Sequence, residues 1–357
     1  MAANTNLHKA KNAKNDEFYT QLTDVSKELM HYKHHFKDKI VFCNCDDPTW
    51  SAFWKYFHLN FEALGLKKLI STHYDKTEPT YKMEYTGGND NDIEVGVKTP
   101  LEGNGDFRNA ECIELLKESD IIVTNPPFSL FREYLAQLIE YNKQFIILGS
   151  NNAITYKEVF PLLKENKVWL GALSWSAELY FSMPKWYEEY LLANKKEGSA
   201  YKIIDGAVMA RAACMWYTNL DLAKRHERLT LWKTYNPEEY PKYDNYDAIN
   251  VDKVVDIPVD YDGIMGVPIS FMDKYCPDQF EVVELGNSRD NFTPNKDYIN
   301  PKKHLKNGKV TNGGAINCVL AIEHNTKPIN TVYYTSDNSK YLVPPYARIL
   351  IRKKVGS

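Results

Sequence analysis

One tetrapeptide, Asn125-Pro126-Pro127-Phe128, combines residue types that could act on an exocyclic amine. Such an amine is conjugated with its ring and is a poor nucleophile. An Asn side-chain oxygen and a main-chain carbonyl can both accept hydrogen bonds from it and orient its developing lone pair. Proline fixes the carbonyl of the preceding residue, and Phe128 offers a ring on which a base can stack. The motif predicts methyl transfer to an adenine amino group without a strong general base; the alternative is a plain Pro-Pro turn.

The segments around the tetrapeptide place it at the edge of a sheet. Residues 120–124 read as a buried strand, and residues 129–141 follow as an amphipathic helix. In open α/β sheets, ligands bind beyond the carboxyl ends of the strands. Strands and helices alternate through the first half of the chain, which predicts an α/β fold with a parallel sheet and helices on both faces. The expected strands are 39–44, 67–72, 120–124, 145–148 and 168–171, and the expected helices are 22–36, 50–64, 110–118, 129–141 and 156–163.

Acidic residues follow several of these strands. Asp46 and Asp47 come after the first, Asp75 after the second, and Asp106 precedes the helix 110–118. Carboxylates suit the hydroxyl and amino groups of a ligand but repel a pyrophosphate. A phosphate site would need glycines and a lysine, and neither the P-loop nor the dinucleotide motif follows a strand here. The pattern favours the phosphate-free cofactor S-adenosylmethionine, although helix capping explains any single Asp equally well.

The chain is expected to contain three regions. Residues 1–173 form the first part of the cofactor-binding and catalytic domain, with a hairpin excursion at 76–104. Residues 174–262 are richer in aromatic and basic side chains and form the predicted target-recognition region, which is less regular. Residues 263–357 are expected to return to the catalytic sheet, with a polar insertion at about 286–345 to which no motif assigns a role.

Composition limits the class of protein. The chain has 357 residues, 43% hydrophobic and 25% charged residues, and a net charge of −3. No apolar run is long enough to span a membrane, and the six dispersed cysteines favour reduced thiols in a cytoplasm and no metal site. Because the net charge is not basic, any contact with DNA must come from local patches. One such patch is Lys302-Lys303-His304 with Lys306 and Lys309.

Taken together, these motifs resemble the EcoRI-type adenine-specific DNA methyltransferases over most of the chain. The resemblance implies a Rossmann-like class I methyltransferase domain that transfers a methyl group from S-adenosylmethionine to N6 of a flipped-out adenine in duplex DNA. The segments that carry it are 15–21, 43–48, 105–108, 123–135, 240–251 and 265–268.

The resemblance also implies roles for individual residues. Asn125 to Phe128 match the catalytic motif, with Asn125 also facing the cofactor, and Asp106 and Phe107 match the segment that contacts the adenine of the cofactor. The element that folds over its methionine part contributes Asp16, Phe18, Tyr19 and Thr20. The first cofactor motif contributes Asn44, Asp46 and Asp47 but lacks the glycine-rich loop of general methyltransferases, and Asp75 is a ribose ligand by position alone.

Other functions stay open from the sequence. A methyltransferase could act on an RNA adenine or a protein glutamine. The fold could also serve a non-catalytic nucleic-acid-binding protein or a regulatory protein that binds S-adenosylmethionine. A companion restriction endonuclease that cuts at the same site is a further possible partner. The intact Asn125-Pro126-Pro127-Phe128 favours the DNA enzyme over the non-catalytic alternatives.

Overall fold

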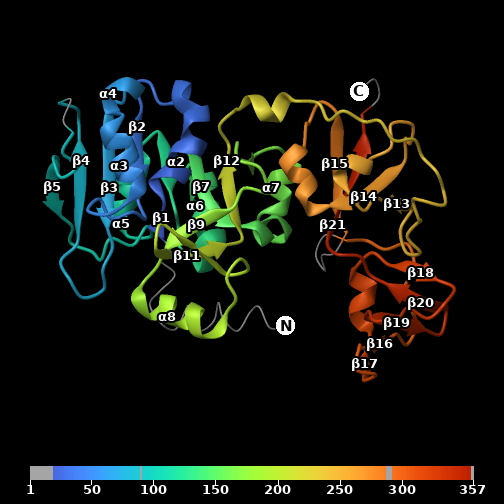
Figure 1. Cartoon of the computed structure of the whole chain (residues 1–357). Coiled ribbons are helices and arrows are strands. Elements are labelled where there is room, and N and C mark those ends of the chain that lie inside the picture. Colours follow the sequence, from blue (N-terminus) through green and yellow to red (C-terminus); the bar gives the residue numbers. More distant parts are fainter. Residues whose placement is uncertain (1–18, 89–90, 287–291, 355–357) are drawn as a thin grey trace. The chain divides into compact units, whose positions relative to one another are not determined.

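An eight-stranded sheet forms the centre of the first part of the chain, and its middle consists of four parallel strands (Figure 1). In spatial order these are β3 (Lys68–His73), β2 (Ile40–Cys43), β6 (Ile121–Thr124) and β7 (Gln144–Ser150). All of β2 and β6 is buried, as expected for parallel strands covered on both faces. Antiparallel strands extend both edges: β4 (Tyr81–Tyr85) and β5 (Val97–Pro100) beside β3, and β12 (Cys214–Thr218) and β8 (Trp169–Leu170) beside β7.

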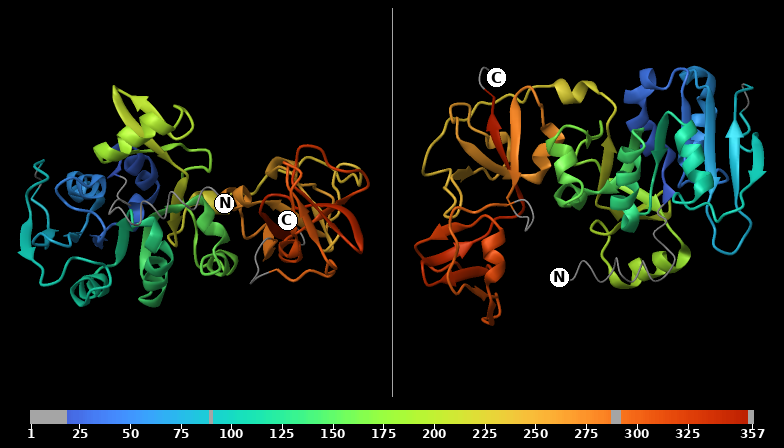
Figure 2. Two further views of the ribbon diagram at one scale, coloured as in Figure 1. Left: turned by 90° about the horizontal axis from the view of Figure 1, so that it is seen from below. Right: turned by 180° about the vertical axis from the view of Figure 1, so that it is seen from behind.

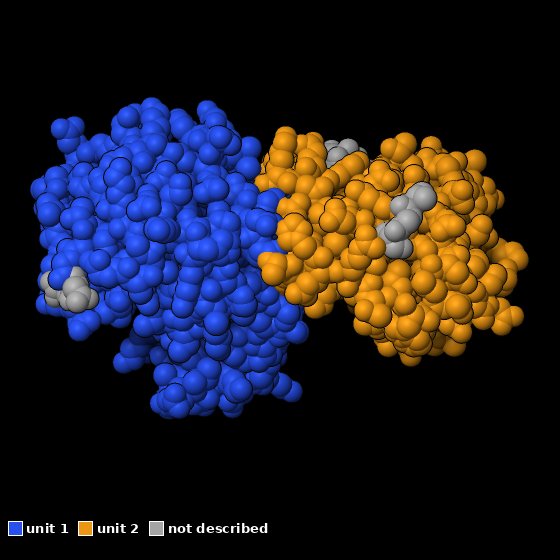
Figure 3. Space-filling model, turned by 90° about the horizontal axis from the view of Figure 1, so that it is seen from above, with its two compact units in different colours: residues 1–151, 168–222 blue, residues 152–167, 223–357 orange. Residues whose placement is uncertain are grey.

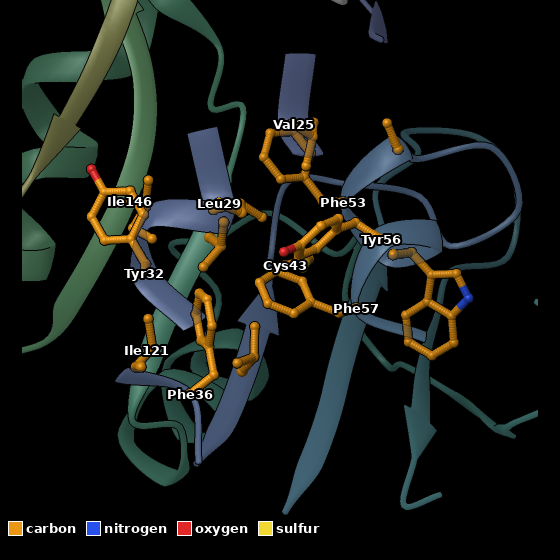
Figure 4. Packing of buried hydrophobic residues seen from close by; sticks show 14 of the residues in the cluster. Val25, Leu29, Tyr32, Phe36, Cys43, Phe53, Tyr56, Phe57, Ile121 and Ile146 are labelled. Carbon is orange, nitrogen blue, oxygen red and sulfur yellow. The ribbon is translucent and has the colours of Figure 1, made fainter. Parts of the chain in front are cut away.

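Helices cover both faces of this sheet, as predicted (Figure 2). One face packs against α2 (Leu22–Leu29), η1 (Met30–His35), α3 (Ala52–Leu59) and α4 (Phe61–Leu64). Figure 4 shows this core, to which Val25, Phe36, Phe57 and Cys43 of β2 belong. The opposite face packs against α5 (Ala110–Glu118) and α6 (Phe131–Glu140).

The helix expected over 50–64 is divided into α3 and α4. Ser51 is the N-cap of α3 and accepts hydrogen bonds from the amides of Phe53 and Trp54. Trp50 therefore lies before the helix and is 39% exposed, although the sequence pattern places it on the buried face. Phe53, Trp54 and Phe57 are buried as predicted.

The structure is a computed structural model that describes residues 19–88, 91–286 and 292–354. The chain divides into two units, coloured separately in Figure 3. Unit 1 comprises residues 1–151 and 168–222, and unit 2 comprises 152–167 and 223–357. Unit 1 also contains α8 (Lys185–Asn194) and a small sheet with the order β1 (Tyr19–Thr20), β9 (Leu179–Ser182), β11 (Ala207–Ala212) and β10 (Tyr201–Ile204).

Unit 2 contains two sheets. The first has the order β13 (Ala248–Asn250), β14 (Ile264–Pro268), β21 (Arg348–Lys353) and β15 (Phe280–Leu285) and contacts α7 (Phe160–Lys164). The second has the order β17 (Val310–Asn312), β16 (Lys302–His304), β19 (Tyr333–Ser336), β20 (Ser339–Val343) and β18 (Ile322–His324). Short 3-10 helices connect the elements: η2 (Phe128–Leu130), η3 (Asn151–Thr155), η4 (Ala223–His226), η5 (Val254–Asp256), η6 (Ile269–Lys274) and η7 (Gly314–Cys318).

Two segments differ from the sequence prediction. The hairpin predicted at 76–104 is present as β4 and β5, but it is part of the main sheet, because β4 pairs with β3. The later strand that joins the main sheet is β12, whose five residues are all buried. The described strands of residues 263–357 do not join the main sheet, since β14 and β15 both pair with β21 instead. Apolar patterning identifies a buried strand but not the partner with which it pairs.

No helix in the described ranges is long and apolar enough to cross a membrane.

Candidate active site

The carboxyl ends of β3, β2 and β6 bring several of the predicted site residues to one edge of the sheet. Asn125 follows β6, Asp46 and Asp47 follow β2, and Asp75 follows β3. Strand β2 lies between the other two and is parallel to both. The same edge is where ligands bind in sheets of this kind.

Asp46 connects the two loops directly. Its carboxylate is 3% exposed and accepts hydrogen bonds from the backbone N–H of Asn125 at 3.2 Å, from the hydroxyl of Ser51 at 3.0 Å and from the hydroxyl of Thr124. Burial raises the pKa of Asp46 to about 6 despite these hydrogen bonds. The carboxylate fixes the first residue of the predicted catalytic tetrapeptide to the loop after β2, and its role as a cofactor ligand stays a prediction.

Asn44 has a comparable link to the helix that follows the tetrapeptide. The hydroxyl of Tyr134, on α6, donates to Oδ1 of Asn44, and both side chains are buried. The ring of Tyr134 also meets the ring of Phe107 edge-on, with centroids 5.0 Å apart. Gln137, one turn further along α6, donates to the carbonyl of Phe107 at 3.1 Å. Helix α6 thus positions two of the predicted cofactor segments.

Asp47 and Asp75 occupy different environments. Asp47 Oδ2 lies 2.6 Å from Nδ1 of His73, and Oδ1 accepts from Thr49 and from the hydroxyl of Tyr81. Asp75 Oδ1 accepts from the amides of Thr77 and Glu78 and from the hydroxyl of Thr77. These local hydrogen bonds lower the pKa of Asp75 to about 2. Asp75 therefore holds a turn, and its role as a ribose ligand stays a prediction.

Asp106 is held by Arg108. The guanidinium donates to both carboxylate oxygens, from Nε at 2.8 Å and from Nη2 at 2.6 Å. Burial raises the pKa of Asp106, but the contacts from Arg108 outweigh it and leave this pKa below its ordinary value. Gly105 precedes it with a φ of +74°, and a Cβ there would lie 2.3 Å from the carbonyl oxygen of His73. Only glycine allows this close approach of the 105–107 loop to the end of β3.

The tetrapeptide itself is partly buried. Pro126 is buried, whereas Asn125, Pro127 and Phe128 are half-buried. Phe128 begins η2 and packs against the core on the α2–α3 face of the sheet. This packing fixes the position of a ring that the sequence assigns to base stacking.

The N-terminal element is described only in part. Asp16 and Phe18 lie outside the described residues. Tyr19 and Thr20 form β1, which pairs with Ser182 and Phe181 of β9. The hydroxyl of Thr20 is buried and has no hydrogen-bond partner in the described part of the chain.

Several residues of the site were missed by sequence reasoning. Ser51, Thr124 and Tyr134 hold the predicted residues in place, and Arg108 and His73 pair with predicted acids. Tyr134 carries a usable signal, because a hydroxyl on the buried face of an amphipathic helix needs a partner. Ser51 also carries a signal, because serine is a preferred N-cap residue directly before an amphipathic helix. Thr124, Arg108 and His73 carry none, because such polar side chains are most often exposed to solvent.

The site has features that fit a cofactor with hydroxyl and amino groups. Nδ2 of Asn44 is buried and has no hydrogen-bond partner among residues 19–88, 91–286 and 292–354. Its amide is 1% exposed, and Tyr134 occupies its oxygen. A buried donor without a partner is costly, so a ligand acceptor would satisfy it. The described residues contain no cluster of His, Cys, Asp and Glu that could hold a metal ion.

The chain matches known proteins over most of its length. The family described as "Adenine-specific methyltransferase EcoRI" matches residues 6–354. The Type II methyltransferase M.EcoRI of Escherichia coli is 49% identical over 298 residues, which cover 80% of this chain and 90% of that protein. M.MpnI of Mycoplasma pneumoniae is 39% identical over 284 residues, covering 78% of this chain and 85% of the relative. M.MgeORF184P of Mycoplasma genitalium is 40% identical over 280 residues, with the same coverage. No solved structure matches the chain.

The fold is α/β and is built on a mixed sheet. One strand of this sheet ends in Asn125-Pro126-Pro127-Phe128, beside a buried carboxylate. This combination defines an enzyme of the methyltransferase class. The chain belongs to the EcoRI-type adenine-specific methyltransferases and is a site-specific DNA adenine methyltransferase.

Proposed function

We propose that this enzyme transfers a methyl group from S-adenosylmethionine to N6 of an adenine that is extruded from duplex DNA. The observation that carries the proposal is the hydrogen bond from the Asn125 N–H to the buried Asp46 carboxylate. This hydrogen bond holds the tetrapeptide, which is proposed to accept hydrogen bonds from the adenine amine. It holds the tetrapeptide beside the loop after β2, which is proposed to bind the methyl donor. A base in a duplex cannot reach such a pocket, so it must leave the stack at a cost of a few kcal/mol.

The proposed cofactor site uses residues from four segments. Asn44 offers its buried amide N–H, and Asp47 and Asp106 offer carboxylate oxygens. Tyr19 and Thr20 of β1 are the described part of the element proposed to cover the methionine end. Phe107 supplies an apolar wall, backed by Tyr134. S-adenosylmethionine supplies an electrophilic methyl group when it is bound. Asp46 is proposed as a positioning residue, because its three hydrogen bonds all lead to protein groups.

The acceptor site centres on Asn125. Its side-chain oxygen and a proline-fixed carbonyl of the tetrapeptide would accept hydrogen bonds from the two amine protons. These contacts increase electron density on the nitrogen and orient it toward the methyl group, and they strengthen as positive charge develops there. Phe128 would stack on the base. The amine releases its proton only as the methyl group arrives, so no strong base is needed.

The fold supports the finer assignment to the Rossmann-like class I methyltransferases. Four parallel strands occupy the centre of the sheet, and the antiparallel β12 is inserted between β7 and β8. The predicted target-recognition region, 174–262, is divided between unit 1 and unit 2 at residue 222. A companion endonuclease and a cytoplasmic location stay predictions from the sequence.

The proposal is tested by incubating the enzyme with S-adenosylmethionine that carries a labelled methyl group, together with duplex DNA, single-stranded DNA, RNA or protein. We expect label on N6 of adenine in duplex DNA. Asn125→Ala should lower the rate by about 100-fold or more, the reduction expected when one polar interaction with the transition state is removed. Label on RNA or protein alone, or an undiminished Asn125→Ala variant, would refute the proposal.

Asn60→Ala is the matched control for this experiment. Asn60 lies between α3 and α4 and donates to the carbonyl of Tyr56 at 2.8 Å, at the end of α3 remote from Ser51. The variant removes the same amide group from unit 1, and its rate should equal that of the wild type. A comparable reduction in both variants would show that the effect of Asn125→Ala is not specific to the site.

A further inference from the structure

The five-stranded sheet of unit 2 has two unlike faces. Successive residues of a strand point to opposite sides of a sheet. Tyr334 and Leu342 are buried on one side, where they pack against Tyr298, Ile316 and Ala321. The other side we call the open face, and the strand pairing assigns to it Lys302, His304, Val310, Asn312, Ile322, His324, Tyr333, Thr335, Tyr341 and Val343. Of these, Lys302, Val310, Asn312 and His324 are exposed.

Stacked rings make the open face a rigid platform. The rings of His304 and Tyr333 are 4.6 Å apart and 4° from parallel, and Tyr341 meets Tyr333 edge-on at 5.7 Å. Nε2 of His304 lies 2.9 Å from the hydroxyl oxygen of Thr335. Lys327 Nζ lies 6.0 Å from the centroid of the Tyr333 ring. Burial and the nearby Lys327 and Lys302 lower the pKa of His304, as expected beside a concentration of positive charge.

The charge of this region is opposite in sign to that of the whole chain. Residues 295–345 contain seven lysines and three acidic residues, whereas the chain carries −3. None of the open-face residues is acidic. Lys296 is paired with Asp244 at 2.8 Å. In the described part of the chain no carboxylate lies within ion-pair distance of the other six: Lys302, Lys303, Lys306, Lys309, Lys327 and Lys340.

Two of these lysines project from a tight turn beside the open face. Lys306 and Lys309 connect β16 to β17 and are exposed. The turn is closed by hydrogen bonds from the amide of Leu305 to the carbonyl of Lys309 and from Gly308 back to Leu305, both 2.9 Å. The turn therefore holds two exposed cations on a defined backbone.

We propose that the open face and the β16–β17 turn bind the phosphate backbone of duplex DNA. This inference rests on the proposed function, because it assigns part of the grip on the substrate to residues 302–341. Lys302 on the open face, Lys306 and Lys309 on the turn and Lys327 beside Tyr333 match a regular polyanion in charge, and no carboxylate of the described residues neutralises them. Lysine binds phosphate as a point charge. Sheet and ribbon elements are known to lie against DNA grooves. The sequence favours 174–262 for target recognition; the charge pattern favours this sheet for backbone contact.

The test is Lys306→Gln/Lys309→Gln, which removes two charges without touching the stacked rings. Binding to a duplex is measured across a range of salt concentrations, together with kcat and the KM values for DNA and S-adenosylmethionine. We expect the variant to bind all duplex sequences more weakly and to the same extent. The slope of the logarithm of the binding constant against the logarithm of the salt concentration should be smaller by about 2, since each lysine that binds a phosphate adds roughly one to it. The KM for DNA should rise while kcat and the KM for S-adenosylmethionine are retained.

The matched control is Lys157→Gln/Lys274→Gln. It removes two exposed charges from unit 2, outside both the five-stranded sheet and the predicted target-recognition region. If both double variants show the same salt slope as the wild type, or if both slopes fall equally, the inference is overturned while DNA methylation by the wild type stands. If the wild type does not methylate duplex DNA at all, the proposed function fails instead.

Discussion

The buried Asp46 leads to a sharp prediction about pH. Its carboxyl has a pKa of about 6 in the folded protein, against 3.8 for an ordinary Asp. The folded state therefore binds this proton more tightly than the unfolded state. Its contribution to stability is fully present below pH 3.8 and is lost as the pH rises through 6. At about 1.36 kcal/mol per pH unit, the loss amounts to about 3 kcal/mol at most.

Asp46→Asn removes this titration. The Asn side chain can keep its oxygen toward Thr124 and the Asn125 N–H while its amide donates to Ser51, so the local structure should persist. We expect the stability difference between wild type and variant to shift by up to about 3 kcal/mol in favour of the variant between about pH 4 and pH 7. Near neutral pH the variant should also have a lower kcat, because the neutral oxygen holds the Asn125 N–H less strongly than a carboxylate does.

Tryptophan fluorescence during urea unfolding measures this difference for the relevant part of the chain. Six of the seven tryptophans lie in unit 1, and Trp54 and Trp216 are buried in the core beside the site. Asp75→Asn is the control, because the pKa of Asp75 is already about 2 and its effect should stay constant from about pH 4 to pH 7. If the free energy of unfolding changes with pH in the same way in the wild type and in Asp46→Asn, the reasoning is refuted.

Two further substitutions test how the site is held. Gly105→Ala should destabilise unit 1 by more than about 1 kcal/mol in urea unfolding, because a positive φ is combined with a Cβ 2.3 Å from the His73 carbonyl oxygen. Gly198 has a φ of +82° and open space around it, so Gly198→Ala should lower the free energy of unfolding by only about 1 kcal/mol. An equal loss of stability at both positions would contradict the steric argument. Tyr134→Phe removes the hydroxyl that holds Asn44 Oδ1, and should raise the KM for S-adenosylmethionine with little change in the KM for DNA. An unchanged KM for the cofactor would show that Asn44 does not depend on Tyr134.

The sequence by itself determined the chemistry and most of the sheet. Buried strands such as β2 and β6 read as apolar runs, because a strand covered on both faces has no polar side. Asn125-Pro126-Pro127-Phe128 was recognisable because its residues are contiguous, and so was the family to which they belong.

Tertiary structure decided the partners of each polar group. Asp46 and Thr124 are 78 residues apart and meet only because β2 and β6 are neighbours. The sequence predicts Asp46 as a cofactor ligand, a role that stays a prediction, and only the structure shows which protein groups its carboxylate binds. Whether β21 would join the main sheet was likewise undetermined, because an apolar strand pattern is satisfied by any sheet that buries it. Local residue types fix which groups can react, whereas strand pairing across the chain fixes which of them are held together.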